Sequence, residues 1–365
     1  MKIIANACRI LVGSIFVFSG FVKLVDPVGT GIKLHEYFDV FGQDVPALKS
    51  FFDIFSHNSL ALSLFFCVFE VILGVALLLN FKTKISIWLS LLMMTFFTFL
   101  TFYSAYFNKV TDCGCFGDFL KLKPWKSFSK DVVLMILIGI LYIYRNKFIT
   151  TKTTGIISLL TGIAFAIGLH AIYYLPSLDF LPYAVGKNIK QEMIPLEKPK
   201  LKFMMQKNGQ ITEFDTFPTD TTYKYVESIV LNEDEAKAKI TDYSFVNIAG
   251  EEVRDSTFEG NKILLLLKND EELPNENIKE YLELMNSLAK KEVYPMILTS
   301  AGPEKILKFK ADNRITINHY IGDEKVLKTM ARANPVLMLL KNGVVKAKWS
   351  ALEIPNEAEI IKNLK

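Results

Sequence analysis

The chain has 365 residues, 51% of them apolar, and a formal net charge of +4. Residues 1–176 carry 15 Lys and Arg against 9 Asp and Glu, whereas residues 177–365 carry 27 against 29. Because the positive excess lies among apolar segments, the charge does not indicate a nucleic-acid-binding protein. The contrast between the halves predicts a membrane-embedded region followed by a soluble one.

Five apolar runs in the first half are each close to the ~20 residues that a helix needs to cross the hydrocarbon core. They cover residues 4–25, 60–81, 85–107, 128–144 and 155–175. Since Lys2 precedes the first run, a cleaved signal peptide is the alternative there. Arg9 and the lack of a small-residue cleavage site before Lys23 favour a span. The spans are expected to hold one acidic residue, Glu70, which leaves a transporter little pathway.

Lys and Arg near the span ends predict the orientation of the helices. Basic residues without acidic neighbours lie at the start of the chain, in the turn at 82–84 and in the segment at 145–152. We therefore expect these sites in the cytoplasm, which places segment 108–127 and the second half of the chain on the opposite side. In a bacterium, that side of the inner membrane is the periplasm, where disulfides can form and persist.

The stretch TDCGCFGD at 111–118 places two cysteines one glycine apart between two predicted spans. All four cysteines lie in the first half: Cys8, Cys67, Cys113 and Cys115. A disulfide between Cys113 and Cys115 would close a very short, strained ring, which suits exchange better than a structural link. Two alternatives stay open: a packing turn with buried thiols, and a zinc site completed by His35 and His57. The two cysteines inside the spans are expected to be packing residues.

In the second half, residues 175–188 contain two prolines and a glycine and are predicted to be a linker, and residues 190–235 are weakly patterned. From residue 243 onward, short strands alternate with amphipathic helices, and a hairpin turns at Asn342-Gly343, which predicts an α/β sandwich. Strands are expected at 262–268, 294–300 and 316–321, a hairpin at 334–349, and helices at 277–291, 303–312, 324–333 and 356–364.

Three segments of the first half resemble the DoxX/MauE group of four-helix membrane proteins over about residues 1–147. They are FSGFVKLVDP (18–27), FEVILGVALLL (69–79) and CGCFGDFLKLKPWKSFSKDVVL (113–134). The resemblance implies that Cys113 and Cys115 are a redox-active dithiol, linked to disulfide formation in a periplasmic partner or to quinone-coupled redox. It also implies that Lys23 and Glu70 are the polar intramembrane positions, either as a structural pair or as proton-handling groups beside a quinone or small ligand.

Residues 243–365 resemble a thioredoxin-like domain, a fusion similar to that in DoxX-type membrane proteins of the Bacteroidetes. Pro335 stands where such folds keep a cis-proline, but NDEELPNENI (269–278) replaces the Cys-x-x-Cys motif. The domain therefore cannot exchange disulfides itself, and Asn334 and Pro335 mark a groove for a protein partner. The predicted divisions are a four-helix membrane domain (1–147), a fifth span (148–176), a linker with a poorly patterned extension (177–242) and a periplasmic thioredoxin-like domain (243–365).

Together these features predict a membrane redox component, a thiol-disulfide oxidoreductase part, whose dithiol works at the periplasmic face while the soluble domain docks an envelope protein. Membrane lipid is the other expected partner, no cofactor is established beyond the quinone that the resemblance implies, and no metal is expected. The alternative is a non-enzymatic membrane scaffold whose thioredoxin-like domain binds envelope proteins.

Overall fold

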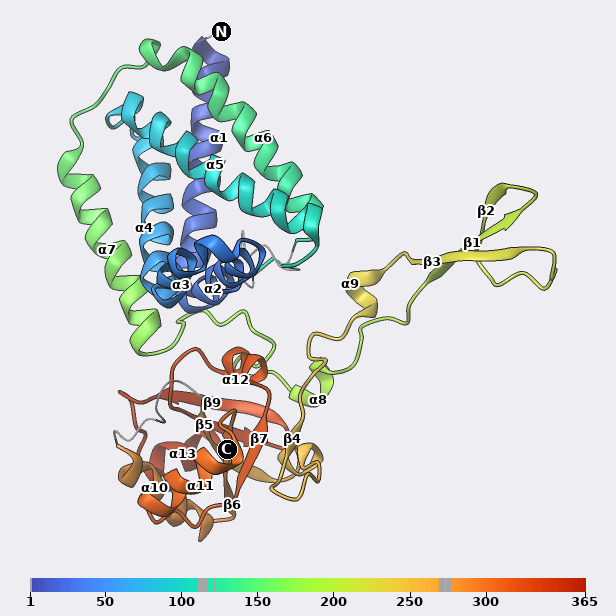
Figure 1. The fold of residues 1–365 in the computed structure, drawn as a ribbon. Helices are drawn as coiled ribbons and strands as arrows, with labels where there is room; N and C mark the ends of the chain where they lie inside the picture. The colour runs from blue at the N-terminus through green and yellow to red at the C-terminus, as the bar shows by residue number, and fades with distance from the viewer. Residues whose placement is uncertain (1, 111–116, 118, 121, 269–272, 274–276) are drawn as a thin grey trace. The chain divides into compact units, whose positions relative to one another are not determined.

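The structure, a computed structural model, describes residues 2–110, 117, 119–120, 122–268, 273 and 277–365 (Figure 1). The chain forms two units, Met1–Leu181 and Pro182–Lys365. The predicted exchanging cysteines, Cys113 and Cys115, lie outside the described residues.

The first unit is helical, and its described part contains five helices long and apolar enough to cross a membrane. They are α1 (Lys2–Val25), α4 (Ser59–Leu78), α5 (Thr83–Phe107), α6 (Pro124–Tyr144) and α7 (Thr154–Tyr173). These helices confirm the five predicted spans, although α6 begins earlier than the apolar run that predicted it. The first unit is therefore a helical membrane domain.

Segment 26–59, expected to be a connection between spans, folds into α2 (Pro27–Asp44), a short 3-10 helix (Pro46–Leu48) and α3 (Lys49–His57). The start of α2 follows from local chemistry, because the Asp26 carboxylate accepts a hydrogen bond from the Gly29 N–H at 2.9 Å and Pro27 occupies the first turn. Buried aromatic side chains then hold α2 against α3, α4 and α5.

Close approach of α1 and α4 depends on glycine. A Cβ atom on Gly74 would lie 2.7 Å from the carbonyl oxygen of Gly13 and 2.7 Å from the backbone nitrogen of Val17. One turn further on, at the C-terminal end of α4, the buried Arg9 guanidinium donates to the carbonyl oxygens of Leu77 and Leu78, which caps the end of the helix. These contacts fix the two helices that carry the predicted intramembrane pair.

The second unit contains a six-stranded sheet in the order β4-β7-β6-β5-β8-β9. Its strands are β4 (Phe245–Val246), β5 (Asn261–Leu267), β6 (Val293–Thr299), β7 (His319–Gly322), β8 (Val336–Lys341) and β9 (Val344–Ser350). The strands β5, β6 and β7 run parallel, whereas β8, β9 and β4 are antiparallel to their neighbours. This is the thioredoxin-like α/β arrangement that the sequence predicts.

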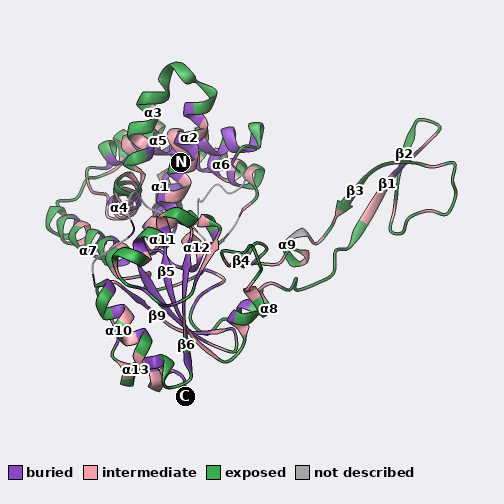
Figure 2. Ribbon diagram, turned by 60° about the horizontal axis from the view of Figure 1, so that its bottom comes forward, coloured by how far each residue is buried: buried purple, intermediate pink, exposed green. Residues whose placement is uncertain are grey.

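Helices cover this sheet and complete its core. They are α10 (Ile278–Ala289), α11 (Pro303–Asp312), α12 (Glu324–Met330) and α13 (Glu357–Asn363). Side chains of α10, α11 and α13 pack with the odd-numbered residues of β5, as the two-residue period of a strand requires. Buried residues accordingly run along β5 and β6 in Figure 2.

The weakly patterned stretch between the linker and the sandwich contains a second sheet, in the order β2-β1-β3. Its strands are β1 (Leu201–Lys207), β2 (Gln210–Phe214) and β3 (Lys224–Val230), preceded by α8 (Ile189–Glu192) and followed by α9 (Glu233–Ala236). The strands β2 and β3 are largely exposed (Figure 2), so they lack the alternation that predicts a half-buried strand.

Candidate functional site

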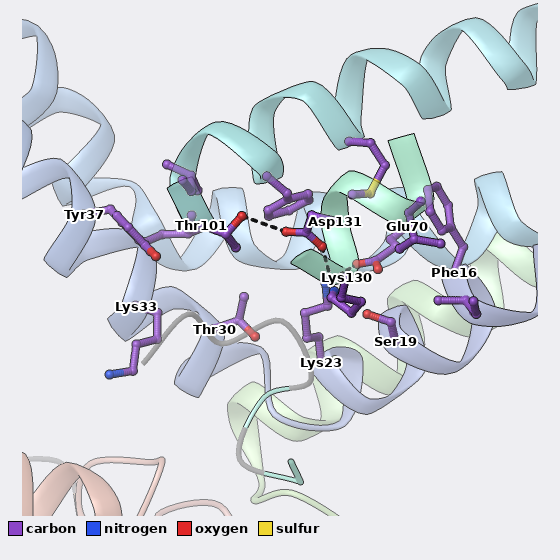
Figure 3. Close-up of a pocket in the computed structure, with 16 residues that line it drawn as sticks. Phe16, Ser19, Lys23, Thr30, Lys33, Tyr37, Glu70, Thr101, Lys130 and Asp131 are labelled. Atoms are coloured by element: carbon purple, nitrogen blue, oxygen red, sulfur yellow. Dashed lines mark hydrogen bonds and ion pairs between the residues drawn. The ribbon is translucent and has the colours of Figure 1, made fainter. Parts of the chain in front are cut away.

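Side chains from α1, α2, α4, α5 and α6 line a small cavity inside the helical unit (Figure 3). Its volume is about 40 Å³. Charged and hydroxyl groups share its wall with Phe16, Met94 and Phe97. Such a convergence of polar groups inside an apolar bundle is expensive and is therefore a candidate functional site.

The first charged pair in the cavity joins Lys23 of α1 to Glu70 of α4 as an ion pair (Figure 3). Lys23 is 5% exposed and Glu70 6% exposed. The Lys23 ammonium also lies 5.0 Å from the centre of the Phe97 ring, within the range of a cation–π contact. The structure thus brings together the two intramembrane residues that the resemblance singled out, and their functional role stays a prediction.

The second charged pair was missed by the sequence prediction. Asp131 of α6 is 1% exposed and accepts a hydrogen bond from the Thr101 hydroxyl of α5 at 2.9 Å. The Lys130 ammonium lies 2.8 Å from the other carboxylate oxygen. The expectation of one acidic residue among the spans is therefore wrong, because Asp131 lies within the run at 128–144. An acidic residue inside an apolar run was the signal that could have found it.

The size of the cavity decides what it can hold. Sites for drug-sized ligands usually have ~300–1,000 Å³, whereas a water molecule needs only ~10–15 Å³. The cavity of about 40 Å³ therefore fits a few water molecules and does not fit a quinone ring.

The described residues on either side of the Cys-Gly-Cys segment pack against the helical unit. Val110 is buried, and its carbonyl oxygen accepts a hydrogen bond from the Ser104 hydroxyl. A Cβ atom on Gly117 would lie 3.9 Å from the carbonyl oxygen of Val22, the residue before Lys23. The chain that carries the cysteines therefore rejoins the described structure beside the end of α1.

His35, one of the two histidines of the zinc alternative, lies at the junction of α2 and α3. Its Nδ1 lies 2.7 Å from the Ser56 hydroxyl oxygen, and its Nε2 lies 3.2 Å from an Asp39 carboxylate oxygen. The described residues contain no group of three or more metal-ligand side chains. Because Cys113 and Cys115 are not among them, the zinc alternative stays untested.

The two cysteines inside the spans, Cys8 and Cys67, are free and buried. The sulfur of Cys67, which lies one helical turn before Glu70 on α4, is 3.9 Å from the Ser63 hydroxyl oxygen.

In the second unit, the peptide bond between Asn334 and Pro335 is cis.

The Asn334 side chain accepts a hydrogen bond from the Lys268 N–H at 3.0 Å and donates to the Lys268 carbonyl at 3.3 Å. These bonds hold the start of β8 beside the end of β5. The residues that follow Lys268, 269–272, lie outside the described part, and partner binding at Asn334 and Pro335 stays a prediction.

Comparisons with known proteins each cover only part of the chain. A family model described as methylamine utilisation protein MauE matches residues 1–144. No curated protein matches the chain.

Solved structures resemble parts of the chain at low identity. A candidate thioredoxin from Neisseria meningitidis shares 13% identity, covers 34% of this chain and 85% of its own, and has a TM-score of 0.28. A thiol:disulfide interchange protein from Bacteroides sp. shares 12% over 33% and 82% of the two chains, with a TM-score of 0.27. The peroxidoxin BcpB of Mycobacterium tuberculosis shares 14% over 34% and 90%, with a TM-score of 0.28.

Solved structures with identities and TM-scores this low give no evidence about the activity of this chain. The fold of the second unit is assigned from its own sheet topology. The MauE match, by contrast, includes every helix that lines the cavity and the whole of the Cys-Gly-Cys segment, whereas α7 and the second unit lie beyond it.

Proposed function

We propose that this protein is an inner-membrane component of thiol–disulfide chemistry in the bacterial cell envelope. Cys113 and Cys115 are its exchanging pair at the periplasmic face, and the second unit docks a protein partner. The observation that carries the proposal is the MauE match over residues 1–144, which includes both cysteines and the buried pair of Lys23 and Glu70.

The chemistry is exchange between the Cys113–Cys115 disulfide and a client dithiol. A client thiolate attacks one sulfur of the pair, the S–S bond breaks, and a mixed disulfide forms. The second client thiolate then attacks the client sulfur of the mixed disulfide and releases the pair as a dithiol. Two electrons pass from client to pair, and the two protons lost by the client thiols balance those gained by the pair.

The second unit contributes binding rather than exchange, since residues 177–365 contain no cysteine. Its cis Asn334–Pro335 bond, held beside the end of β5, is the position that we propose contacts an extended segment of the client. The same lack of cysteine favours the second candidate function, a non-enzymatic scaffold that binds envelope proteins without thiol chemistry.

A labelling experiment on the full chain in intact cells tests the proposal. In a variant with Cys8 and Cys67 replaced by Ala, only the pair remains to react. We expect a membrane-impermeant maleimide to label it after mild reduction and not before, because the pair is an accessible disulfide. Labelling before reduction would contradict a resting disulfide, and a lack of labelling in both cases would contradict a periplasmic pair.

A second experiment separates exchange from scaffolding. Cys115→Ser should accumulate a client-linked species that disappears on reduction. It forms by the reverse reaction, in which the Cys113 thiolate attacks a client disulfide, and it persists because Cys115 is no longer present to displace the client. Cys113→Ser/Cys115→Ser should abolish the activity of the protein in cells, whereas Cys8→Ala/Cys67→Ala is the matched control that should retain it. Unchanged activity of the variant without the pair would leave scaffolding as the function.

A further inference from the structure

The segment between the first two spans contains a short amphipathic helix, α3, whose apolar side is exposed (Figure 2). Leu48, the residue before α3, is followed at intervals of three residues by Phe51 and Ile54, and each of these side chains is half exposed or more. In a helix of 3.6 residues per turn the three positions lie on one side, which we call the apolar side of α3. Large apolar side chains exposed together along a helix indicate a surface that contacts something other than water.

The remaining sides of α3 divide into a core side and a charged side. Phe52 and Phe55 are partly buried and pack with the aromatic cluster that joins α2 to α5. Lys49 and Asp53 are exposed and lie on the part of the helix that is turned away from Phe51. A helix with an exposed apolar side and an opposed charged side has the pattern of a helix that lies along a membrane surface.

We propose that α3 is an in-plane membrane anchor. Its apolar side inserts among the lipid acyl chains at the membrane surface where α4 begins, and its charged side faces the headgroups and water. The partner of this surface is therefore phospholipid. The inference goes beyond the proposed function and does not depend on it.

The place of α3 in the chain brings it to the membrane surface. The helix ends at His57 and the span α4 begins at Ser59, so one residue, Asn58, separates them. Because consecutive Cα atoms are about 3.8 Å apart, the end of α3 lies within roughly 8 Å of the start of the span. Figure 1 shows α2 and α3 at the end of the helical unit where α4 begins and α1 ends. A helix joined so closely to a span stays beside the lipid.

Ring contacts connect α3 to the lipid-facing surface of another span. Phe99, a half-exposed residue of α5, has its ring centre 5.9 Å from that of Phe41 on α2. The ring of Phe41 lies 5.6 Å from Phe52, which lies 5.5 Å from Phe51. Phe99 precedes Phe107, the end of α5, by about 12 Å along the helix axis at 1.5 Å per residue. The rings therefore form a layer that runs from the hydrocarbon-facing side of α5 to the apolar side of α3, which favours lipid over a protein partner.

An anchored α3 also holds α2 in place. The Ser56 hydroxyl of α3 donates to the Asp39 carboxylate of α2 at 2.5 Å, and the rings of Phe55 and Phe38 lie 5.5 Å apart. The helix α2 in turn contributes one wall of the cavity. Contacts of α3 with lipid should therefore limit the movement of α2 relative to the spans.

The end of α2 extends this effect to the chain that leads to the cysteines. The Asp44 carboxylate accepts a hydrogen bond from the Tyr103 hydroxyl of α5 and forms an ion pair with Lys109. Lys109 precedes the Cys-Gly-Cys segment, and Asp44 directly precedes the turn that enters α3. The anchor therefore keeps the described chain before that segment close to the membrane surface.

Spin-label accessibility on the full-length chain in lipid nanodiscs tests the proposal. The four native cysteines are replaced, and single labels are attached through Phe51→Cys, Ile54→Cys or Asp53→Cys. Labels at 51 and 54 should have a several-fold higher ratio of collisions with oxygen, which concentrates in the hydrocarbon, to collisions with a water-soluble nickel chelate. The label at 53 is the matched control on the charged side of the same helix and should favour the chelate.

Two reference labels set the scale of the measurement. Ile136→Cys, at an exposed position of the span α6, gives the value for lipid, and Ile211→Cys, at an exposed position of β2, gives the value for water. Labels at 51 and 54 with the same ratio as Ile211→Cys would overturn the proposal, because the apolar side would then face water. Labels there that meet neither reagent would overturn it too, because a client, a second copy or the second unit would then cover the side.

A measurement on the unsubstituted protein guards against a variant that fails to fold. The nanodiscs contain a phospholipid with an aryl diazirine on the acyl chain close to the glycerol. Illumination should attach more lipid to Phe51 and Ile54 than to Asp53, as located by the masses of peptide fragments. Lipid attached to the spans but not to α3 would overturn the proposal. Because the cysteines take no part in this reaction, failure of the cysteine labelling experiment would remove the proposed function and leave the anchor standing.

Discussion

Replacing Lys23 by methionine tests the buried ion pair directly. The substitution keeps the length of the side chain but leaves the Glu70 carboxylate without its cation inside the bundle. Removing one partner of a buried pair typically costs ~3–5 kcal/mol, because the other charge stays desolvated. The lost contact with the Phe97 ring adds roughly 0.5–2 kcal/mol. We therefore expect the free energy of unfolding to fall by at least ~3 kcal/mol.

The double variant Lys23→Met/Glu70→Leu distinguishes charge pairing from packing. It removes both charges while keeping apolar volume, so its stability should return to near the wild-type value. Reversible unfolding of the full chain in bicelles, run as a double-mutant cycle, measures the coupling between the two positions. The exposed pair Lys33–Glu36 is the matched control and should show a coupling of ~0.5 kcal/mol or less. Additive effects of Lys23→Met and Glu70→Leu would refute this account of the pair.

Two further predictions concern packing and pH. Gly74→Ala should lower the free energy of unfolding by ~1–3 kcal/mol, because its Cβ would lie 2.7 Å from the Gly13 carbonyl oxygen. Gly139→Ala, with no atom within 4 Å of the new Cβ, should be neutral or slightly stabilising in the same assay, and equal losses at both sites would contradict the close approach. Burial, together with the charge of a neighbouring lysine, lowers the pKa of His319 from 6.5, so the unfolded chain binds more protons and the second unit should lose stability as the pH falls below about 6.5. His319→Gln should flatten this dependence in denaturant titrations across that pH range, and an unchanged slope would argue against a buried neutral histidine.

The hydropathy of the sequence and the spacing of its apolar residues were sufficient to predict most of the fold. The five spans and the alternating order of strands and helices after residue 243 follow from the length and spacing of apolar residues. The helix at Pro27–Asp44 was missed, although Asp26 and Pro27 are a helix-start pattern, because the segment lies between two long apolar runs and is not itself one. The sheet of β1, β2 and β3 was missed because side chains on both of its faces are exposed, which removes the two-residue alternation.

Whether the sequence predicted a site residue depended on how much the polarity of that residue differs from that of its neighbours in the chain. Glu70 is surrounded by apolar residues on both sides, so the sequence marks it clearly. Asp131 lies near the start of its apolar run and directly after Lys130, a context that is also typical of the polar end of a span. Thr101 carries no signal at all, because hydroxyl groups in helices can bond to their own backbone. Only the tertiary fold brings these residues around one cavity.

Glu70 and Asp131 are held by different contacts, so substitutions at the two positions should affect the stability of the bundle differently. Glu70 is held by a cation from another helix, so changing it disturbs the contact of α1 with α4. Asp131 is paired within its own helix and receives only the Thr101 hydrogen bond from α5, which an asparagine can still accept. Asp131→Asn should therefore lower the free energy of unfolding less than Lys23→Met does, because the Lys130 side chain that it leaves unpaired from Asp131 is 25% exposed and stays partly solvated. A loss of stability as large as that of Lys23→Met would mean that the Asp131 charge serves the fold, and the cavity would then be a structural feature at both of its acids.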